Sequence, residues 1–315
     1  MGSTWSIALT TSNASEPPKL HVELYEHIFA HLDAIEDFQT LLNLSLTCAT
    51  LSKYGQAVLF SKVVLGRPTV NPPLSTVKTT VRSNTAPPRM FRPATLFRAL
   101  LGASPHLAKY VKELVISDRR YLPFYQKEKS WLRGDEQIAL ILPLLPNLCK
   151  ISIYGYPSHI DHRFTWDLLR PSLQRAIVDE LRIGTISSLD AHRLDIPVAI
   201  LGLSPSLKYL SLRGTLFRTA LDASHHDEGL PASLCKPSLS SLEIATFEEV
   251  EWSQFEQWLT GPSSPNLSSL RTLVISFSPR SIAKQLAFVK KHLHSLDCLE
   301  LQFPKEGMCV TSNWD

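Results

Sequence analysis

The sequence predicts a mixed helix-and-strand protein (α+β or α/β) that consists of an N-terminal three-helix module and a curved solenoid with a mostly parallel sheet. Apolar residues recur with a helical period in residues 20–59, and a proline-rich stretch follows. From residue 95 onward, one leucine-containing phrase returns several times. Hydrophobic residues make up 44% of the 315 residues, which is enough to build a core in both parts.

The helical module is expected over residues 19–65, after a polar segment, residues 1–18, that we expect to be disordered. An amphipathic first helix is predicted by apolar residues spaced four apart: Leu20, Leu24, Ile28 and Leu32. A second helix is expected after Asp37, a third around residues 51–59, and a short strand at residues 62–65. Residues 66–94, rich in Pro, Ser and Thr, predict a linker or long loop.

The recurring phrase is a leucine-containing lead followed by a short alternating strand. Its copies include YVKELVISD, LPNLCKISIYGY, SPSLKYLSLRG, KPSLSSLEIATF, NLSSLRTLVISFS and LHSLDCLELQF. One apolar anchor per strand is expected to face the core: Ile116, Ile153, Ala191, Leu212, Ile244, Ile275 and Leu301. Helix-like stretches lie between the strands, at residues 95–101, 135–142, 252–259 and 282–292.

A strand and a helix per unit predict an irregular leucine-rich-repeat-like domain over residues 95–303, followed by a tail, residues 304–315. Most spacings between anchors exceed the roughly 20 to 29 residues of regular leucine-rich repeats. The third anchor has an alternative register at Leu181 or Ile183. Helical spacing over residues 172–182 favours Ala191 instead.

Composition and motifs exclude several classes of function. The net charge of +3 combines 32 basic and 29 acidic residues, which gives no long-range attraction to nucleic acid. We find no apolar run near the roughly 20 residues of a membrane span, and the myristoylation pattern at Gly2 lacks a second signal, so no stable membrane association is expected. Five scattered cysteines indicate a reduced protein of the cytoplasm or nucleus. Without a nucleophile elbow or a phosphate loop, we expect no enzyme activity and no catalytic, cofactor-binding or metal-binding residues.

The segments LHVELYEHIFAHL (residues 20–32) and DFQTLLNLSLTCATLSKYGQAVLFSKVVL (residues 37–65) resemble an F-box. The SLTC-x-x-L run and the closing LF-x-x-V-x-L are similar to those of fungal F-box proteins whose C-terminal parts are irregular leucine-rich repeats. The resemblance implies binding to a Skp-type adaptor and, through it, to a cullin ubiquitin ligase. The residues that it assigns to adaptor binding are Leu20, Leu24, Ile28, Leu32, Leu44, Cys48 and Leu51.

The resemblance also implies that the repeats hold an unknown protein substrate. The positions that alternate with the anchors are expected on the concave sheet face: Glu113, Ser117, Tyr154, Arg182 or His192, Arg213, Glu243, Val274, Glu300 and Gln302. Among them, Tyr154, Arg213 and Glu300 are our candidates for substrate contact, because Tyr and Arg are frequent in binding hot spots. The alternative is a leucine-rich-repeat-like interaction scaffold without a cullin link, since His21 stands where F-boxes usually have Pro.

Overall fold

The computed structural model describes residues 22–34, 36–47, 49–66, 92–118, 131–155, 164–214, 217–218, 236–245, 249–261, 264–276, 282–292 and 295–302. The chain divides between Leu59 and Phe60 into two compact units. The segments 1–18 and 304–315, and most of the expected linker 66–94, lie outside the described residues. Each unit is considered by itself below.

In its described residues the first unit has the three predicted helices: α1 (Val22–Ala30), α2 (Phe38–Thr47) and α3 (Ala49–Leu59). Helix α1 packs on α3 through aromatic rings, because the ring of Tyr54 stacks on Tyr25 at 5.9 Å and on Phe29 at 5.7 Å between centroids. Phe29 is therefore buried, whereas Leu24 and Ile28, from the predicted series of apolar residues four apart, are exposed. The face of α1 that packs on α3 is therefore the one that carries Tyr25 and Phe29, not the one that carries Leu24 and Ile28.

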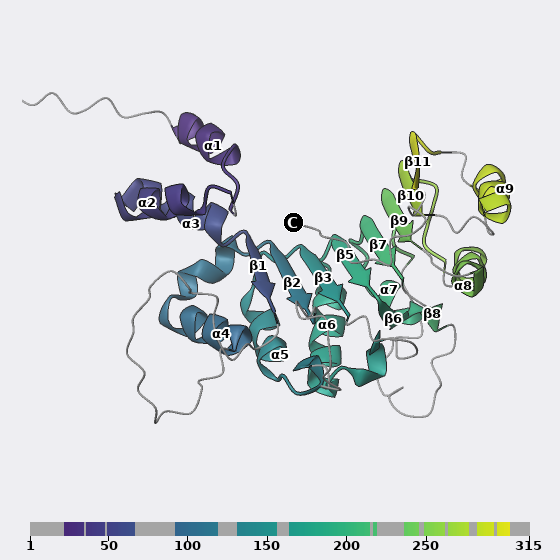
Figure 1. Cartoon of the computed structure of the whole chain (residues 1–315), viewed down its shortest axis with the longest axis horizontal. Coiled ribbons are helices and arrows are strands. Elements are labelled where there is room, and N and C mark those ends of the chain that lie inside the picture. The colour runs from purple at the N-terminus through teal and green to yellow at the C-terminus, as the bar shows by residue number, and fades with distance from the viewer. Residues whose placement is uncertain are drawn as a thin grey trace, which may run out of the picture. The chain divides into compact units, whose positions relative to one another are not determined.

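The second unit is built on a sheet in which eight strands are described, all paired in parallel and ordered as in the chain (Figure 1). The strands are β1 (Lys62–Leu65), β2 (Glu113–Ser117), β3 (Lys150–Tyr154), β5 (Ser188–His192), β7 (Tyr209–Arg213), β9 (Ser241–Ala245), β10 (Thr272–Ser276) and β11 (Cys298–Gln302). The strand predicted at residues 62–65 exists, but it pairs with β2 and belongs to this unit rather than to the helical one.

The predicted alignment of the strands is confirmed. Ile116 pairs with Ile153, Ile153 with Ala191, and the series continues without a slip to Leu301. The expected helix before Ala191 is α6 (Pro171–Ile183), so Leu181 and Ile183 are not strand anchors. Leu212, Ile244 and Ile275 are each at most 2% exposed, as expected for side chains that face a core.

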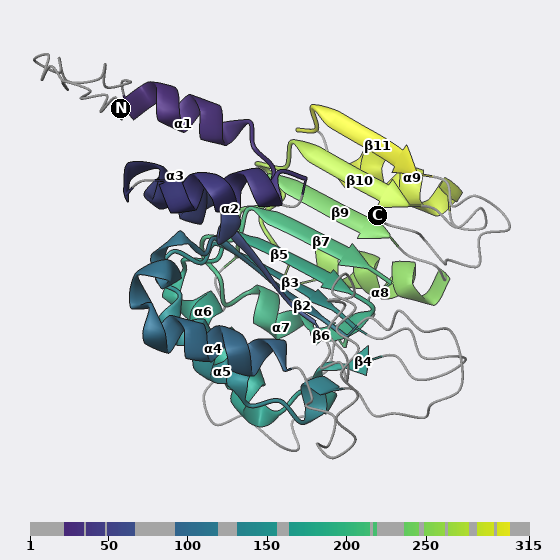
Figure 2. The same ribbon diagram turned by 60° about the vertical axis from the view of Figure 1, so that its left-hand side comes forward.

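Helices cover one face of this sheet, as Figures 1 and 2 show. They are α4 (Pro93–Ala103), α5 (Gln137–Ile141), α6, α7 (Val198–Leu201), α8 (Glu249–Thr260) and α9 (Ile282–His292). Short 3₁₀ turns join them: η1 (Pro105–Tyr110), η2 (Trp131–Arg133), η3 (Leu142–Leu144) and η4 (Trp166–Leu168). The apolar core lies between these helices and the inward-facing side chains of the strands. The opposite face, called the open face below, is covered by no helix of this unit in the described part.

A second, three-stranded parallel sheet was not predicted. It contains β4 (Phe164–Thr165), β6 (Leu194–Pro197) and β8 (Phe217–Arg218). Strands of two to four residues are too short to show a period, which explains why the sequence did not reveal them. Arg193, with φ of 53°, turns the chain from β5 into β6, and Gly214, with φ of 59°, follows β7 at the equivalent position.

Candidate binding site on the open sheet face

Alternation along the strands places polar side chains together on the open face. Because Leu189 and Ala191 of β5 face the core, Asp190 and His192 belong to the other face. The same reasoning applies to the aligned positions on β3, β7 and β9. We call the following residues the open-face cluster: Tyr154, Asp190, His192, Ser211, Arg213 and Glu243.

Main-chain hydrogen bonds hold the ends of these strands in line. The Gly155 N–H donates to the His192 carbonyl oxygen at 2.7 Å, and the Arg193 N–H donates to the Arg213 carbonyl oxygen at the same distance. The ladder therefore extends past the last residues of β3 and β5. This extension restrains the backbone from which Tyr154, His192 and Arg213 project.

Two aromatic rings and a carboxylate form one half of the cluster. The Tyr154 hydroxyl donates a hydrogen bond to Asp190 Oδ2 at 3.1 Å. The Tyr154 and His192 rings lie beside each other, with centroids 5.5 Å apart and a tilt of 37°. Neighbouring strands are about 4.8 Å apart, so these side chains of β3 and β5 are direct neighbours.

The other half of the cluster is an ion pair. Arg213 Nη2 lies 2.6 Å from Glu243 Oε1, and the Ser211 hydroxyl donates to Glu243 Oε2 at 2.8 Å. Both carboxylate oxygens of Glu243 are therefore engaged by side chains of β7. Arg213 and Glu243 are thus paired across β7 and β9, and both charges act on Asp190 of the neighbouring strand β5.

Burial raises the pKa of the Asp190 carboxyl above its ordinary value. The hydrogen bond from Tyr154 and the positive charge of Arg213 act in the opposite direction and offset only part of this effect. Glu243 adds to the increase by like-charge repulsion. The cluster thus contains a carboxylate whose charge is poorly compensated, which suits the binding of a hydrogen-bond donor.

Two of the three candidates for substrate contact lie in this cluster, and the third does not. Tyr154 and Arg213 are on β3 and β7, on either side of His192. Glu300 is on β11, where it is exposed and accepts a hydrogen bond from Gln302 Nε2 at 2.9 Å. Of the two alternatives on the third strand, His192 is the correct one, because Arg182 belongs to helix α6.

Asp190 and Ser211 were missed by the sequence analysis. They occupy the position directly before the anchors Ala191 and Leu212, and Glu243 has the same place before Ile244. Glu243 was already among the predicted positions, and a search of the same place in every strand would have added Asp190 and Ser211. Their mutual contacts, however, depend on pairing between segments more than 20 residues apart.

The residues assigned to adaptor binding are spread over the first unit. Leu24 and Ile28 of α1 are 47% and 49% exposed. Leu32, Leu44 and Leu51 are half-buried, while Leu20 and Cys48 lie outside the described residues. Two exposed apolar side chains on α2 were not singled out for this role: Phe38, 52% exposed, and Leu46, 78% exposed.

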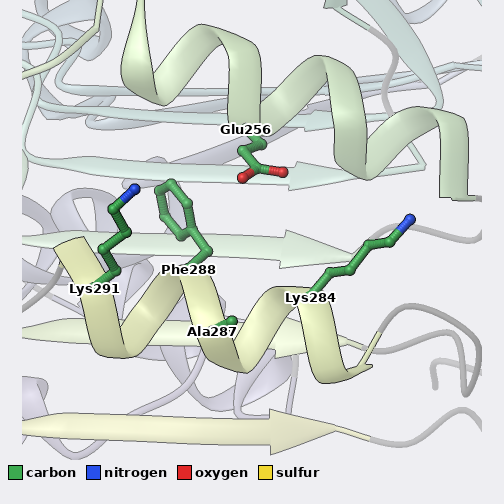
Figure 3. Close-up of a pocket in the computed structure, with 5 residues that line it drawn as sticks. All are labelled: Glu256, Lys284, Ala287, Phe288 and Lys291. Carbon is green, nitrogen blue, oxygen red and sulfur yellow. The ribbon is translucent and has the colours of Figure 1, made fainter.

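Apart from the open-face cluster, a hollow of about 310 Å³ lies between α8 and α9. Figure 3 shows Lys284 and Lys291 reaching from α9 toward α8, with Phe288 between them and Glu256 opposite. The lysines and Ala287 are exposed, so the hollow is a surface groove rather than an enclosed site. No buried charge lines it, and we regard the open-face cluster as the stronger candidate.

Among the described residues, no three His, Cys, Asp or Glu side chains are grouped so that they could hold a metal ion. No helix in the described ranges is both long and apolar enough to cross a membrane. Comparisons of the chain with protein-family models, with curated proteins and with solved structures found no match.

Proposed function

We propose that the chain is the substrate-recognition adaptor of a Skp–cullin–F-box type ubiquitin ligase. The observation that carries the proposal is the exposure of large apolar side chains on the small helical unit, on both α1 and α2. Leu24, Ile28 and Leu46 contribute little to the core of this unit, and burial against a partner would remove their apolar surface from water. This arrangement agrees with the F-box resemblance of residues 20–65.

The second unit is suited to hold a protein substrate. Its strands follow chain order and its helices gather on one face, which supports a leucine-rich-repeat-like solenoid. The open-face cluster offers an aromatic pair and several charges to a partner. In this role the chain needs no catalysis or cofactor of its own, because the ligase's conjugating enzyme carries out the chemistry. The ligase core places it in the cytoplasm or nucleus.

The second candidate is an interaction scaffold without a cullin link. It is favoured by the departures of this sequence from the F-box pattern, which include His21 in the place of Pro and Leu51 in the place of a frequent Trp. Leu51 is half-buried on α3. Binding of the Skp-type adaptor separates the two candidates.

The test is co-purification of a Skp-type adaptor with the full chain and with the double variant Leu24→Asp, Ile28→Asp. We expect the double variant to fold normally, since both side chains are exposed, and to lose the adaptor. A buried unpaired charge costs several kcal/mol, and each 1.4 kcal/mol is about tenfold in affinity.

The matched control places the same two charges on exposed apolar residues of the second unit, as Leu96→Asp and Ile183→Asp. This control should retain the adaptor. Retention by the Leu24 and Ile28 variant would contradict the interface. An absence of adaptor even with the unmodified chain would favour the scaffold.

A further inference from the structure

Two oxygen atoms on the open face are buried without a hydrogen-bond partner among the described residues. They are Oδ1 of Asp190 and Oγ of Ser152. Ser152 is only 1% exposed and pairs directly with Asp190 across strands β3 and β5. Both side chains come from the face that alternation assigns to the open side of the sheet. Two unsatisfied oxygens are therefore neighbours.

An unsatisfied buried acceptor is unfavourable. A buried carboxylate oxygen in this state loses its hydration without gaining a protein partner, and native proteins rarely leave such groups unsatisfied. When Asp190 is ionised its carboxylate can only accept hydrogen bonds, so a partner for Oδ1 is then a donor. A donor that is also positively charged would satisfy both the hydrogen bond and the charge.

The nearby basic side chains are engaged with other carboxylates. Arg213 lies 2.6 Å from Glu243, and Lys150 lies 3.2 Å from Glu113. In the described part of the structure, no cation forms an ion pair with Asp190. Arg213 offsets part of the charge of Asp190 without pairing with it, so a direct counter-charge for this carboxylate would have to come from a partner.

The rings beside Asp190 suit a long basic side chain. Tyr154 and His192 lie 5.5 Å apart, and Tyr154 already bonds the second oxygen of Asp190. Lysine and arginine carry an apolar stem below the charged group, and this stem packs well on aromatic rings. A carboxylate next to such rings therefore matches both parts of a basic side chain.

We propose that this part of the open face binds a lysine or arginine side chain of a protein partner, with its charged group beside Asp190 and its stem along Tyr154 and His192. The inference rests on the proposed function, in which the second unit recruits a protein substrate. It specifies a substrate segment with a basic residue. The ion pair of Arg213 and Glu243 borders the site on the side of β7 and β9.

The experiment selects binders for the full chain from a random peptide library displayed on phage. We expect the selected peptides to share a Lys or Arg whose replacement by norleucine lowers affinity at least about tenfold. This replacement is made on the peptide, so its result is independent of protein folding. Selected peptides without a shared basic residue, or a failure to select any peptide, would overturn the proposal.

The protein side is tested with Asp190→Asn, which keeps the shape and the capacity to accept from Tyr154 but removes the charge. It should weaken the selected peptide at least about tenfold. Asp179→Asn removes an exposed carboxylate on helix α6, which covers the other face of the sheet, and should change affinity by less than about twofold. Equal binding by the Asp190→Asn variant would mean that water, rather than a cation, satisfies the carboxylate, and the proposal would be wrong.

Adaptor co-purification distinguishes a failure of this inference from a failure of the proposed function. The Asp190→Asn variant should retain the adaptor, because the change lies in the second unit. A chain that binds the adaptor but selects no basic peptide would keep the ligase role and lose only the basic substrate. A chain that selects basic peptides but binds no adaptor would be the scaffold instead.

Discussion

At the scale of single residues, burial sets the behaviour of Glu180 on helix α6. This residue is 7% exposed, and burial, followed by the nearby charge of Asp179, raises the pKa of its carboxyl. A folded-state pKa above the unfolded value means that ionisation is less favourable in the folded chain. Glu180 therefore lowers the free energy of unfolding wherever it is ionised.

We predict that Glu180→Gln raises the free energy of unfolding at pH 7. The gain should shrink as the pH falls through the raised folded pKa, and it should vanish below the unfolded pKa of about 4.3, where both states are protonated. Denaturant unfolding of both proteins between pH 4 and pH 8 measures this difference. A loss of stability at pH 7 would show instead that the ionised carboxylate stabilises the fold.

At the scale of elements, the close packing of α2 and α3 depends on Gly55. A Cβ atom at this position would lie 2.4 Å from Ser45 Oγ and 3.1 Å from the Leu41 carbonyl oxygen. The Ser45 hydroxyl donates to that same carbonyl oxygen at 2.7 Å, which limits how far it can move. Glycine is required here by the approach of the two helices.

We predict that Gly55→Ala destabilises the helical unit by about 1 to 3 kcal/mol, although alanine favours a helix by about 1 kcal/mol over glycine. Ser45→Ala in the same chain should recover part of the loss, because it removes the atom closest to the new methyl group. A double-mutant cycle by denaturant unfolding gives the coupling between the two sites.

Gly102 of α4 is the matched control, since no atom lies within 4 Å of a Cβ built there. Gly102→Ala should leave stability unchanged or raise it by up to about 1 kcal/mol. Similar effects of alanine at Gly55 and Gly102 would contradict the packing argument.

At the scale of the whole molecule, the boundary between the two units lies before β1. The F-box resemblance extends to Leu65, yet Lys62–Leu65 pairs with β2 and Leu65 is 1% exposed. A truncation that separates adaptor binding from substrate binding should therefore begin at Phe60 rather than after residue 66.

We predict that residues 60–315 fold cooperatively, while residues 67–315 are less stable by at least about 2 kcal/mol because the buried Leu65 and its strand are lost. Thermal unfolding followed by circular dichroism compares the two fragments. In a cell lysate, residues 60–315 should lose the adaptor and the cullin but keep at least one other specific partner. Equal stability of the two fragments, or retention of the cullin, would contradict this division.

Several features of the second unit could be predicted because they arise from neighbours in the chain. Alternating apolar residues identified the anchors from Ile116 to Leu301, and the helical spacing before Ala191 selected the correct register. The buried residues of the helical unit were harder to predict. Its first helix has apolar residues on two adjoining faces, and only the contact with Tyr54 decides that Phe29 is buried while Leu24 is not.

The sequence by itself determined where most of the helices and the strands of the eight-stranded sheet lie, and which residues of these strands face the core, since periods of 3.6 and 2 are local properties of the backbone. Tertiary structure alone decided the environment of Asp190. The hydrogen bond from Tyr154 and the unsatisfied Ser152 beside it come from β3, and the charge of Arg213 comes from β7. A pKa and an unmet hydrogen bond depend on burial and on groups distant in the chain, so they emerge only when the strands pair.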